Sequence, residues 1–486
     1  MTALDQFKSS LSRADLWSWI RGGLIGEKAV VEGPWGEHPM IYADYVASGR
    51  ALAQVEDFVR DEVLPYYANT HTQASYCGAR STKLREAARA EIARIVGAGE
   101  GTSVVFTGSG ATAGLNRIAG LLDIPGVLAA GGRAVVLVGP YEHHSNLLPW
   151  RESGAEVIEI AEAAHGGPDM AQIEAALVDN AGADLLVGTF SAASNVTGIE
   201  TDTVAVTRLL KAHGALAVWD YACAAPYVAI DMGEDTDAAK DAIVFSAHKF
   251  VGGPGASGVM VVRDAIARRR TPTLPGGGTV SFVSPWGHVY SDDLAHREEG
   301  GTPNVVGDIR VALVMLVKEA LGVAALVARQ EELRQRARAV WEQNDRIEIL
   351  GCAGADRALP IFSFRIRDAE GGLVHHQLFT RMLSDLYGIQ ARGGCACAGS
   401  YAHHLLGLDK AASDATFAAI AAGQETQKPG WVRLNFSALL SDEKAETIIR
   451  AVDELARTAE ANAAHYEADH ANARFAPIVA EARRSA

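Results

Sequence analysis

A lysine follows a short apolar stretch of the sequence and stands beside a histidine and several glycines. In Ile243-Val-Phe-Ser-Ala-His-Lys249-Phe-Val-Gly-Gly-Pro-Gly255, the apolar residues predict a buried strand that ends just before Lys249. Ligands bind at the carboxyl ends of parallel strands. Burial in such a crevice lowers the pKa of a lysine and supplies the neutral amine that forms an imine with a carbonyl compound. For this segment alone, a surface lysine at a strand end is an equal alternative.

A glycine-rich turn farther upstream has the pattern of an anion site. In Val104-Val-Phe-Thr-Gly-Ser-Gly-Ala-Thr-Ala-Gly-Leu-Asn116, a predicted strand ends at Thr107 and a helix begins near Ala111. The first N–H groups of a helix have no partner within it, so those of Ala111 and Thr112 are predicted to bind a phosphate. The motif does not say which ligand carries the phosphate, and a tight structural turn stays an alternative.

A second glycine pattern, Gly253, Gly255 and Gly258, matches the G-x-G-x-x-G sequence of dinucleotide-binding proteins. That motif requires a helix after the glycines, whereas the sequence predicts a strand over residues 258–262. We therefore do not expect a dinucleotide at this segment.

Polar residues follow three more predicted strands. Asp220 ends one of them, and a carboxylate there pairs well with a protonated ring nitrogen. His143 offers an imidazole that can stack on a flat ring, and Asn195 follows another strand. Each residue alone has an ordinary alternative, a helix cap or a solvent-facing loop. Together with Lys249 at one edge of a sheet, they predict a single ligand site.

The elements that must position these residues alternate along residues 60–265. Apolar runs are separated by longer helical segments, which is typical of a mostly parallel sheet covered by helices on both faces. The sequence therefore predicts an α/β domain. Its predicted strands are 102–107, 134–138, 184–190, 216–219, 242–245 and 258–262.

The rest of the chain predicts a functional loop and a second domain. Residues 271–309 are rich in Gly, Pro, Ser and Asp and are expected to form a loop at the rim of the site. An amphipathic helix is predicted from 310 to about 344, and the mixed pattern after it predicts a smaller α+β domain. Its strands are expected near 347–351, 360–366 and 431–436, and its helices near 375–387 and 442–457. The predicted division is an N-terminal segment, 1–60, packing with the small domain, a large domain, 61–310, and a small domain, 311–486, with a terminal helix over 458–486.

Composition restricts the class of protein. A chain of 486 residues is expected to form more than one domain. The net charge of -15 disfavours nucleic-acid binding, and the basic run Arg268-Arg-Arg270 is more typical of a solvated helix end. No stretch approaches the ~20 apolar residues of a membrane span, so we expect no membrane contact and a cytoplasmic protein. Five cysteines do not form the pattern of a secreted disulfide framework.

These motifs together resemble the class V aminotransferases, a branch of the fold-type I enzymes that use pyridoxal 5'-phosphate (PLP), and above all the cysteine desulfurases and selenocysteine lyases. The resemblance extends from about Tyr42 to Glu454. It implies an α/β fold of type I, with a mostly parallel seven-stranded sheet in the large domain and a smaller α+β domain. It also implies PLP as the cofactor, an amino acid substrate and a homodimer.

The resemblance assigns roles to residues of this chain. Lys249 matches the lysine that carries PLP as a Schiff base, His143 matches the ring-stacking histidine, and Asp220 matches the partner of the pyridine nitrogen. The phosphate ligands it implies are Ala111, Thr112, Ser246, His248 and, reaching from the neighbouring subunit, Thr302 in Gly300-Gly-Thr-Pro-Asn304.

Substrate-binding residues are implied in the same way. Asn195 matches an asparagine near the cofactor O3' and the substrate carboxylate, and Arg433 matches the arginine that binds this carboxylate. Asp44 and His71 lie in segments that resemble the family's substrate side.

The chain departs from the family pattern at its cysteines. Cys223 stands where the family usually has Gln or His bonded to the cofactor O3', and a thiol is a weaker hydrogen-bonding group. In Arg392-Gly-Gly-Cys-Ala-Cys397, Cys397 occupies the position of the persulfide-forming cysteine, while Cys395 and Ala396 replace two histidines. The set Cys395, Cys397, His403 and His404 has the chemistry of metal ligands, but its spacing is not a familiar zinc pattern, so no metal is expected.

The implied reaction converts L-cysteine into L-alanine and leaves a persulfide on Cys397, for which a sulfur-acceptor protein is an expected partner. An aminotransferase, an epimerase or a C–S lyase acting on another amino acid is the main alternative. A non-catalytic protein of this fold and a nicotinamide-dependent oxidoreductase that uses Gly108, Gly110 and Gly114 are more distant alternatives.

Overall fold

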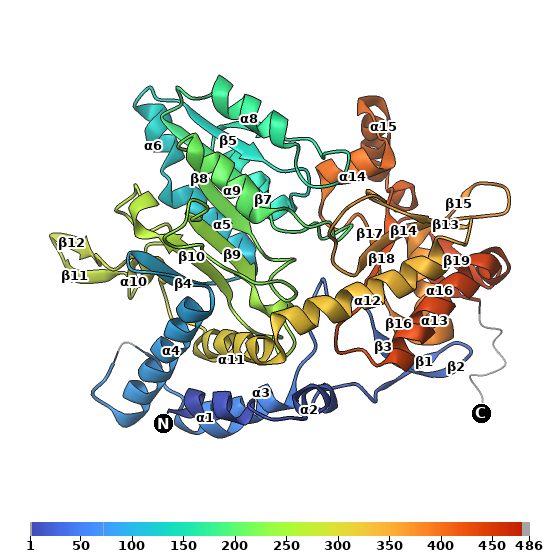
Figure 1. Ribbon diagram of the computed structural model, residues 1–486, viewed down its shortest axis with the longest axis horizontal. Coiled ribbons are helices and arrows are strands. Elements are labelled where there is room, and N and C mark those ends of the chain that lie inside the picture. The colour runs from blue at the N-terminus through green and yellow to red at the C-terminus, as the bar shows by residue number, and fades with distance from the viewer. Residues whose placement is uncertain (1, 71, 479–486) are drawn as a thin grey trace.

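The computed structural model describes residues 2–70 and 72–478 and has two lobes (Figure 1). The larger lobe contains a seven-stranded sheet, and the smaller lobe contains a five-stranded sheet. Helix α12, Val323–Trp341, extends from the large lobe along the small one. This arrangement confirms the predicted α/β domain with a smaller α+β domain.

The seven-stranded sheet has the order β4-β10-β9-β8-β7-β5-β6. Strand β10 pairs antiparallel with both of its neighbours, and the remaining pairs are parallel. The strands are β4 Thr102–Gly108, β5 Ala134–Val138, β6 Glu156–Glu159, β7 Leu185–Ser191, β8 Leu216–Asp220, β9 Ala242–Ser246 and β10 Gly258–Arg263. Only β6 was not predicted, because this edge strand is half-exposed and lacks an apolar run.

Helices cover both faces of the sheet because alternate side chains of each buried strand point to opposite faces. Val135 and Leu137 of β5 belong to one core cluster, and Val136 and Val138 belong to another. The first cluster includes buried residues of α4 Tyr76–Ile95, α8 Met170–Asp179, α9 Thr203–Ala212 and α11 Val305–Leu321, and the second includes those of α5 Gly110–Leu121 and α7 Leu148–Glu152. Strands buried on both faces are therefore continuous apolar runs.

The helix predicted from 310 to 344 is two helices. Helix α11 ends at Leu321, Gly322 has φ +82°, and α12 starts at Val323 with a bend of 75° between the axes. Nearly all of α11 is buried in the core of the large lobe, so its apolar residues surround the helix rather than form one stripe. The left-handed backbone at Gly322 suits a residue without Cβ.

The small lobe has the sheet order β13-β14-β18-β17, with β15 paired to β14. Buried residues of α12, α13 and α16 pack with this sheet in one core cluster. The elements are β13 Ile347–Ile349, β14 Ile361–Arg367, β15 Leu373–Val374, α13 His376–Tyr387, β16 Ile389–Gln390, β17 Arg392–Gly394, α14 Gly399–Leu406, α15 Lys410–Ala421, β18 Trp431–Asn435 and α16 Asp442–Ala463.

Two sequence predictions differ from the structure. The loop predicted over 271–309 contains a hairpin, β11 Val280–Ser284 with β12 Gly287–Tyr290, and the short helix α10 Leu294–Glu298. The terminal helix predicted over 458–486 continues only to Ala463, and a hairpin of β19 Tyr466–Asp469 and β20 Arg474–Pro477 follows. Residues 479–486 lie outside the described part of the chain.

The N-terminal segment contacts both lobes. Helices α1 Ala3–Ser10, α2 Leu16–Gly22 and α3 Ala53–Phe58 place buried residues in the core of the large lobe. Strand β3, Ile41–Tyr42, instead pairs with β16, and Ile41 joins the small-lobe core. Domain boundaries at residues 60 and 310 stay a prediction.

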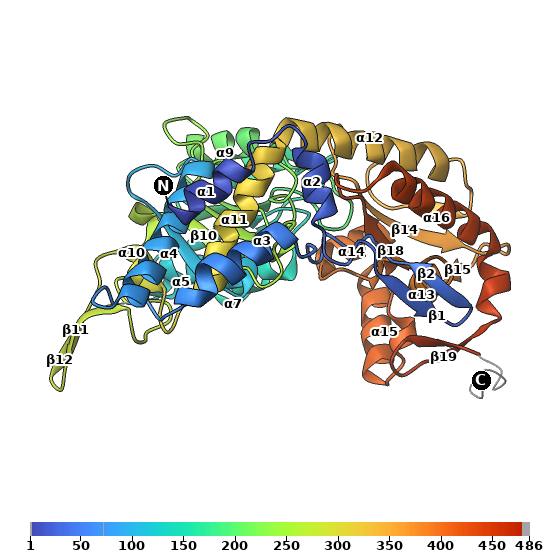
Figure 2. The ribbon, with the colours of Figure 1, turned by 90° about the horizontal axis from the view of Figure 1, so that it is seen from below.

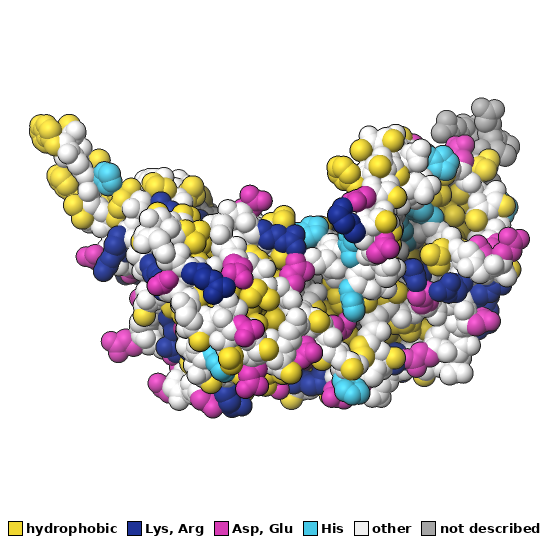
Figure 3. All heavy atoms as spheres, turned by 90° about the horizontal axis from the view of Figure 1, so that it is seen from above, with side chains coloured by type: hydrophobic (Ala, Val, Ile, Leu, Met, Phe, Trp, Pro, Cys, Tyr) yellow, Lys and Arg dark blue, Asp and Glu magenta, His cyan; other side chains and the backbone are white. Residues whose placement is uncertain are grey.

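Two projections extend from the body of the molecule. The β11–β12 hairpin projects from the large lobe, and α15 projects from the small lobe (Figure 2). The face in Figure 3 is hollowed between the two ends, and Lys, Arg and His side chains lie near its middle. Among the described residues, no single helix has the length and apolar composition of a membrane span, and only the bent pair α11 and α12 meets that test together.

Candidate active site

A cavity of about 210 Å³ lies where β7, β8 and β9 end. Because the carboxyl ends of parallel strands meet at one edge of the sheet, side chains far apart in the sequence come together there. Nine predicted site residues line the cavity: Ala111, Thr112, His143, Asn195, Asp220, Cys223, Ser246, His248 and Lys249.

One end of the cavity is built from the start of α5. Gly110 has φ +61°, and a Cβ atom at this position would lie 2.8 Å from the hydroxyl oxygen of Ser246. The N–H of Ala111 donates to Ser246 Oγ at 2.9 Å, and the hydroxyl groups of Thr112 and Ser145 are 2.6 Å apart. N–H and O–H donors from separate elements thus converge at a helix N-terminus, which suits a phosphate.

Lys249 ends a short turn, Ala247–Lys249, that directly follows β9. Its Nζ makes no hydrogen bond within the described residues, and it lines the cavity together with Asp220 and Cys223. Burial lowers the pKa of Lys249, although the negative forms of Cys223 and Asp220 oppose this effect. The structure thus favours a neutral amine at the position that the sequence predicted.

Asp220 and His143 line the same cavity, and burial shifts their pKa values in opposite directions. Burial raises the pKa of Asp220, whose carboxylate accepts one hydrogen bond within the described residues, from Ala222 N at 2.7 Å. Burial, and secondarily the charge of Lys249, lowers the pKa of His143 to about 4. Its Nδ1 accepts the N–H of Ser145 at 3.1 Å, so the proton of the neutral ring lies on Nε2.

Arg433 lies beside the cavity rather than on its wall. Its Nη1 donates to the carbonyl oxygen of Asn195 at 3.0 Å, and its Nη2 donates to Asp44 Oδ1 at 3.2 Å. Arg392 Nε donates to the other oxygen of Asp44 at 2.9 Å. Among the described residues, Arg433 Nε and Asn195 Oδ1 are buried polar atoms without a partner. An arginine donor and an amide acceptor are thus available for a ligand.

Cys223 lies at the cavity with its thiol donating to the carbonyl oxygen of Ser194 at 3.7 Å. Burial raises the pKa of Cys223 to about 11. The group at this position is therefore a neutral thiol, which is a weak hydrogen-bond donor.

The turn that carries Cys397 is bonded to the rim of the cavity. Asn195 Nδ2 donates to the carbonyl oxygen of Ala396 at 2.8 Å. The N–H of His144 donates to the carbonyl oxygen of Cys397 at 2.9 Å. Cys397 is exposed, and Cys395 is half-buried. Two cavity elements, the loop at Asn195 and the loop after β5, therefore hold a small-lobe cysteine turn.

Thr302 and His71 are not among the residues brought together. Thr302 is exposed in the loop before α11, so within one chain it does not reach the cavity. His71 lies outside the described residues. Among the described residues there is no group of three or more His, Cys, Asp and Glu side chains suited to a metal ion.

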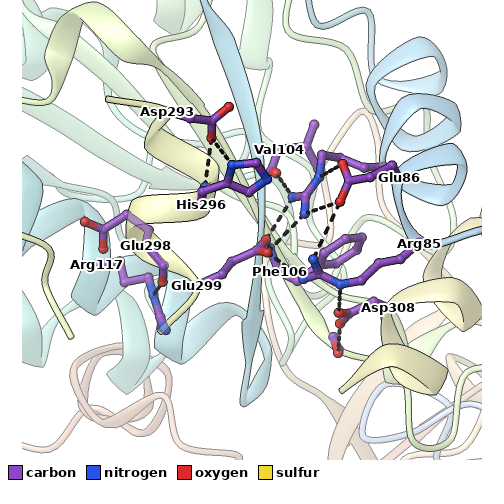
Figure 4. A network of polar contacts seen from close by, with 12 residues as sticks. Arg85, Glu86, Val104, Phe106, Arg117, Asp293, His296, Glu298, Glu299 and Asp308 are labelled. Atoms are coloured by element: carbon purple, nitrogen blue, oxygen red, sulfur yellow. Dashed lines mark hydrogen bonds and ion pairs between the residues drawn. The ribbon is translucent and has the colours of Figure 1, made fainter. Parts of the chain in front are cut away.

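A buried ionic network holds the loop of Thr302 (Figure 4). Glu299 accepts from Arg89 at 2.8 Å, from Arg85 at 2.5 Å and from the N–H of Phe106 at 2.7 Å. Burial tends to raise the pKa of Glu299, but its bonds to Arg89 and the charges of both arginines outweigh burial and lower it. Arg85 also pairs with Asp308 of α11 at 2.7 Å. Both ends of the Gly300–Asn304 segment are thereby fixed to α4 and β4.

Sequence reasoning missed three polar residues around His143. Ser145 and Ser191 line the cavity. Glu142 accepts from both the N–H and the hydroxyl of Ser191, at 2.8 and 2.7 Å, and burial raises the pKa of Glu142 to about 7. Glu142 and Ser145 are sequence neighbours of His143, and Ser191 ends β7, so their positions at strand ends were the available signal.

The lining residues fit PLP, the cofactor that the sequence resemblance implies. A helix N-terminus with hydroxyl groups matches a phosphate, an unbonded amine matches an aldehyde, and a buried carboxylate matches a ring nitrogen. The Oδ1 atom of Asn195 has no hydrogen-bond donor among the described residues, so it is an additional acceptor for a bound ligand.

Comparisons with known proteins agree with this geometry. A family model, aminotransferase class-V, matches residues 41–422. The "probable cysteine desulfurase" of Vibrio cholerae serotype O1 is 30% identical over 365 residues, which cover 74% of this chain and 85% of that protein. A "probable cysteine desulfurase" of Halalkalibacterium halodurans is 26% identical over 371 residues, covering 74% and 84%.

Solved structures share the fold. The cysteine desulfurase of Thermococcus onnurineus superposes with a TM-score of 0.70 at 25% identity, covering 86% of this chain and 94% of that one. The Escherichia coli cysteine desulfurase CsdA also gives 0.70, at 22% identity, covering 90% and 98%. These matches confirm fold type I. The chain belongs to the class V aminotransferase family of PLP-dependent enzymes.

Proposed function

We propose that this protein is a cysteine desulfurase, which converts L-cysteine into L-alanine and holds the sulfur as a persulfide on Cys397. The observation that carries the proposal is the bonding of the exposed Cys397 turn to Asn195 and His144, next to the cavity that contains Lys249. Relatives named cysteine desulfurase support the substrate class.

The residues that would hold PLP are those of the cavity wall. Lys249 provides the covalent link, Asp220 pairs with the ring nitrogen, His143 stacks on the ring, and the start of α5 with Ser246 and His248 receives the phosphate. When bound there, PLP supplies an electron sink for the carbanion that forms at the substrate Cα.

The other steps belong to the chain's own side chains. Lys249, whose pKa is lowered by burial, removes the proton from the substrate Cα as the neutral amine. Arg433 binds the substrate carboxylate, since its buried Nε donor has no partner among the described residues. The free Oδ1 of Asn195 is an acceptor, so it suits a hydrogen-bond donor of the cofactor or substrate. The Cys397 thiolate attacks the substrate sulfur.

A homodimer completes the proposed site. Thr302 lies in an exposed loop whose two ends are held through Glu299 and Asp308, and it would contribute to the phosphate site of the partner subunit. The β11–β12 hairpin supports this assembly because its apolar side chains lack cover: Phe282 and Val283 are each 61% exposed and Trp286 is 92% exposed. The exposed Cys397 also leaves its sulfur accessible to an acceptor protein.

The test is product analysis with purified protein, PLP and L-cysteine. We expect alanine and a protein-bound persulfide, and we expect Cys397→Ser to lose persulfide formation. Cys352→Ser is the matched control, since Cys352 is a half-buried thiol outside the cavity. Lys249→Ala should retain no cofactor after borohydride reduction. Alanine formation that requires a keto acid, or full desulfuration by Cys397→Ser, would instead favour an aminotransferase or a lyase.

A further inference from the structure

We propose that Cys395 is a resolving thiol that attacks the persulfide on Cys397, forms a Cys395–Cys397 disulfide and releases the sulfur as hydrogen sulfide. This inference rests on the proposed desulfurase function. It adds to that function a second thiol step and a dependence on a thiol reductant.

The two cysteines belong to one tight turn. Cys395 is its first residue and its carbonyl oxygen accepts the N–H of Ala398 at 3.3 Å. The central residues, Ala396 and Cys397, have φ +56° and +55°, the left-handed region that is sterically unfavourable for a residue with Cβ. Two consecutive residues in this region without a glycine indicate a backbone held by its surroundings.

Contacts from the large lobe hold this turn. Asn195 donates to the carbonyl oxygen of Ala396, and His144 donates to that of Cys397. The Nε2 atom of His144 also accepts the N–H of Gly399 at 3.0 Å. The two central carbonyl groups and the residue after the turn are therefore fixed, which restrains the backbone that joins the two cysteines.

The turn brings the two cysteines within reach of a disulfide. Consecutive Cα atoms are 3.8 Å apart, so residues two apart across a bent backbone have Cα atoms about 5.5–6 Å apart. Disulfide-bonded cysteines most often have this separation, about 5.5–6 Å. No movement of the lobes is needed for the bond.

Burial separates the roles of the two thiols. Cys397 is exposed, where a substrate sulfur or an acceptor can reach it. Cys395 is half-buried and packs against the apolar cluster that contains Tyr401 and Trp431. A sheltered thiol beside an exposed one does not compete for substrate, but it can react with a sulfur bound to its neighbour.

The other cysteines near the site are engaged elsewhere. Cys352 borders the same apolar cluster, and its thiol donates to the carbonyl oxygen of Ala164 at 3.1 Å. Cys223 lies on the cavity wall, bonded to Ser194. Neither of these two cysteines belongs to the turn of Cys397, whereas Cys395 does.

The step balances without an external oxidant. The Cys395 thiolate attacks the sulfur atom of Cys397, the sulfur–sulfur bond of the persulfide breaks, and the outer sulfur leaves as hydrosulfide. The proton from the Cys395 thiol accompanies the hydrosulfide, so one persulfide and one thiol give one disulfide and one hydrogen sulfide. The outer sulfur is reduced while the two cysteines are oxidised. A dithiol reductant restores both thiols for another turnover.

A single-turnover experiment tests this step. The reduced holoenzyme, in excess over L-cysteine and free of added thiol, is quenched, and alanine, sulfide and the peptide with both cysteines are measured. We expect wild type to give alanine and an equal amount of sulfide, with a peptide lighter by two hydrogens. Cys395→Ser should give the same alanine, no sulfide and a peptide heavier by one sulfur atom. Cys352→Ser, the control, should match wild type.

Each failure has a separate outcome. Wild type that forms alanine but keeps the persulfide, as Cys395→Ser does, overturns the resolving role alone. Absence of alanine from all three proteins overturns the proposed function and the persulfide step with it. A second arm needs no turnover: oxidised glutathione should convert Cys395 and Cys397 of cofactor-free protein into a disulfide in wild type and in Cys352→Ser. Failure to form that disulfide refutes the geometry whatever the substrate.

Discussion

The side-chain amide of Asn195 donates a hydrogen bond to the carbonyl oxygen of Ala396, with 2.8 Å between nitrogen and oxygen. The same side chain lines the cavity that contains Lys249, and its Oδ1 has no partner among the described residues. One amide therefore joins the proposed cofactor pocket to the turn of the proposed sulfur nucleophile. A ligand that bonds to Oδ1 would fix the orientation of the amide and so the position of Cys397.

This contact predicts the behaviour of Asn195→Ala in protein without cofactor. Loss of one partly buried hydrogen bond, worth about 1–1.5 kcal/mol, should loosen the turn. We expect alkylation of Cys397 by a maleimide to become about fivefold to tenfold faster. Peptide mass spectrometry of labelled protein measures the rate, and Cys77 on α4 serves as the internal control. An unchanged rate at Cys397 would show that Asn195 does not restrain the turn.

The network around Glu299 predicts a large loss of stability for Glu299→Gln. Its carboxylate is buried between Arg85 and Arg89, and removing one partner of a buried ion pair costs about 3–5 kcal/mol. Glu86 contacts Arg89 at 3.0 Å but its side chain is 42% exposed. Glu86→Gln should therefore lower the free energy of unfolding by less than about 1 kcal/mol.

Urea unfolding of both variants measures the difference. Since Glu299 directly precedes the Gly300–Asn304 segment, we also expect Glu299→Gln to release PLP more readily than Glu86→Gln does. Equal and small losses of stability in the two variants would contradict the role of the network.

Sequence patterns located every strand of the large sheet except β6, and most of the cavity. Buried parallel strands such as β5 and β9 are uninterrupted apolar runs, so each strand end, and with it Asp220, Ser246 and Lys249, was located without the structure. The half-exposed β6 and the β11–β12 hairpin were missed because their side chains do not form buried runs.

Long-range contacts were beyond the sequence. The resemblance assigned Arg433 to the substrate carboxylate, but it did not show that Asp44, which is 389 residues away in the chain, shares its guanidinium. The sequence around Cys397 likewise did not show that Asn195 and His144 hold the cysteine turn. Hydrogen bonds between distant segments leave no periodic pattern in a single sequence.

Lys318 predicts a dependence of stability on pH. It lies within α11, its Nζ donates to the carbonyl oxygen of Ala225 at 2.5 Å and to that of Val228, and burial lowers its pKa to about 7. In the unfolded chain a lysine has a pKa of about 10.4. Between these values the unfolded state binds more protons, so the stability of the folded state rises as the pH rises.

Lys318→Met should remove this contribution. From pH 7 to pH 9, we expect the free energy of unfolding of wild type to rise by about 2 kcal/mol relative to that of Lys318→Met. Urea unfolding at both pH values provides the comparison. Lys410→Met, which changes a side chain that is 89% exposed, should keep the pH dependence of wild type. Parallel pH profiles for wild type and Lys318→Met would contradict a neutral buried amine.

The hairpin between β10 and α10 predicts the mode of self-association. Trp286 at its turn is 92% exposed, and Val289 on its second strand is 58% exposed, so the described residues leave these apolar side chains of the hairpin uncovered. Apolar aromatic residues of this kind contribute about 2 kcal/mol or more where they are buried at an interface. Trp286→Ser should therefore raise the dimer dissociation constant by about thirtyfold or more.

Sedimentation velocity over a range of protein concentrations measures this dissociation constant. Phe417→Ser is the matched control, since Phe417 is 74% exposed on α15 of the other lobe. If PLP-saturated wild type sediments as an active monomer, or if Phe417→Ser dissociates the dimer and Trp286→Ser does not, the hairpin is not the dimer contact and Thr302 must act within its own chain or not at all.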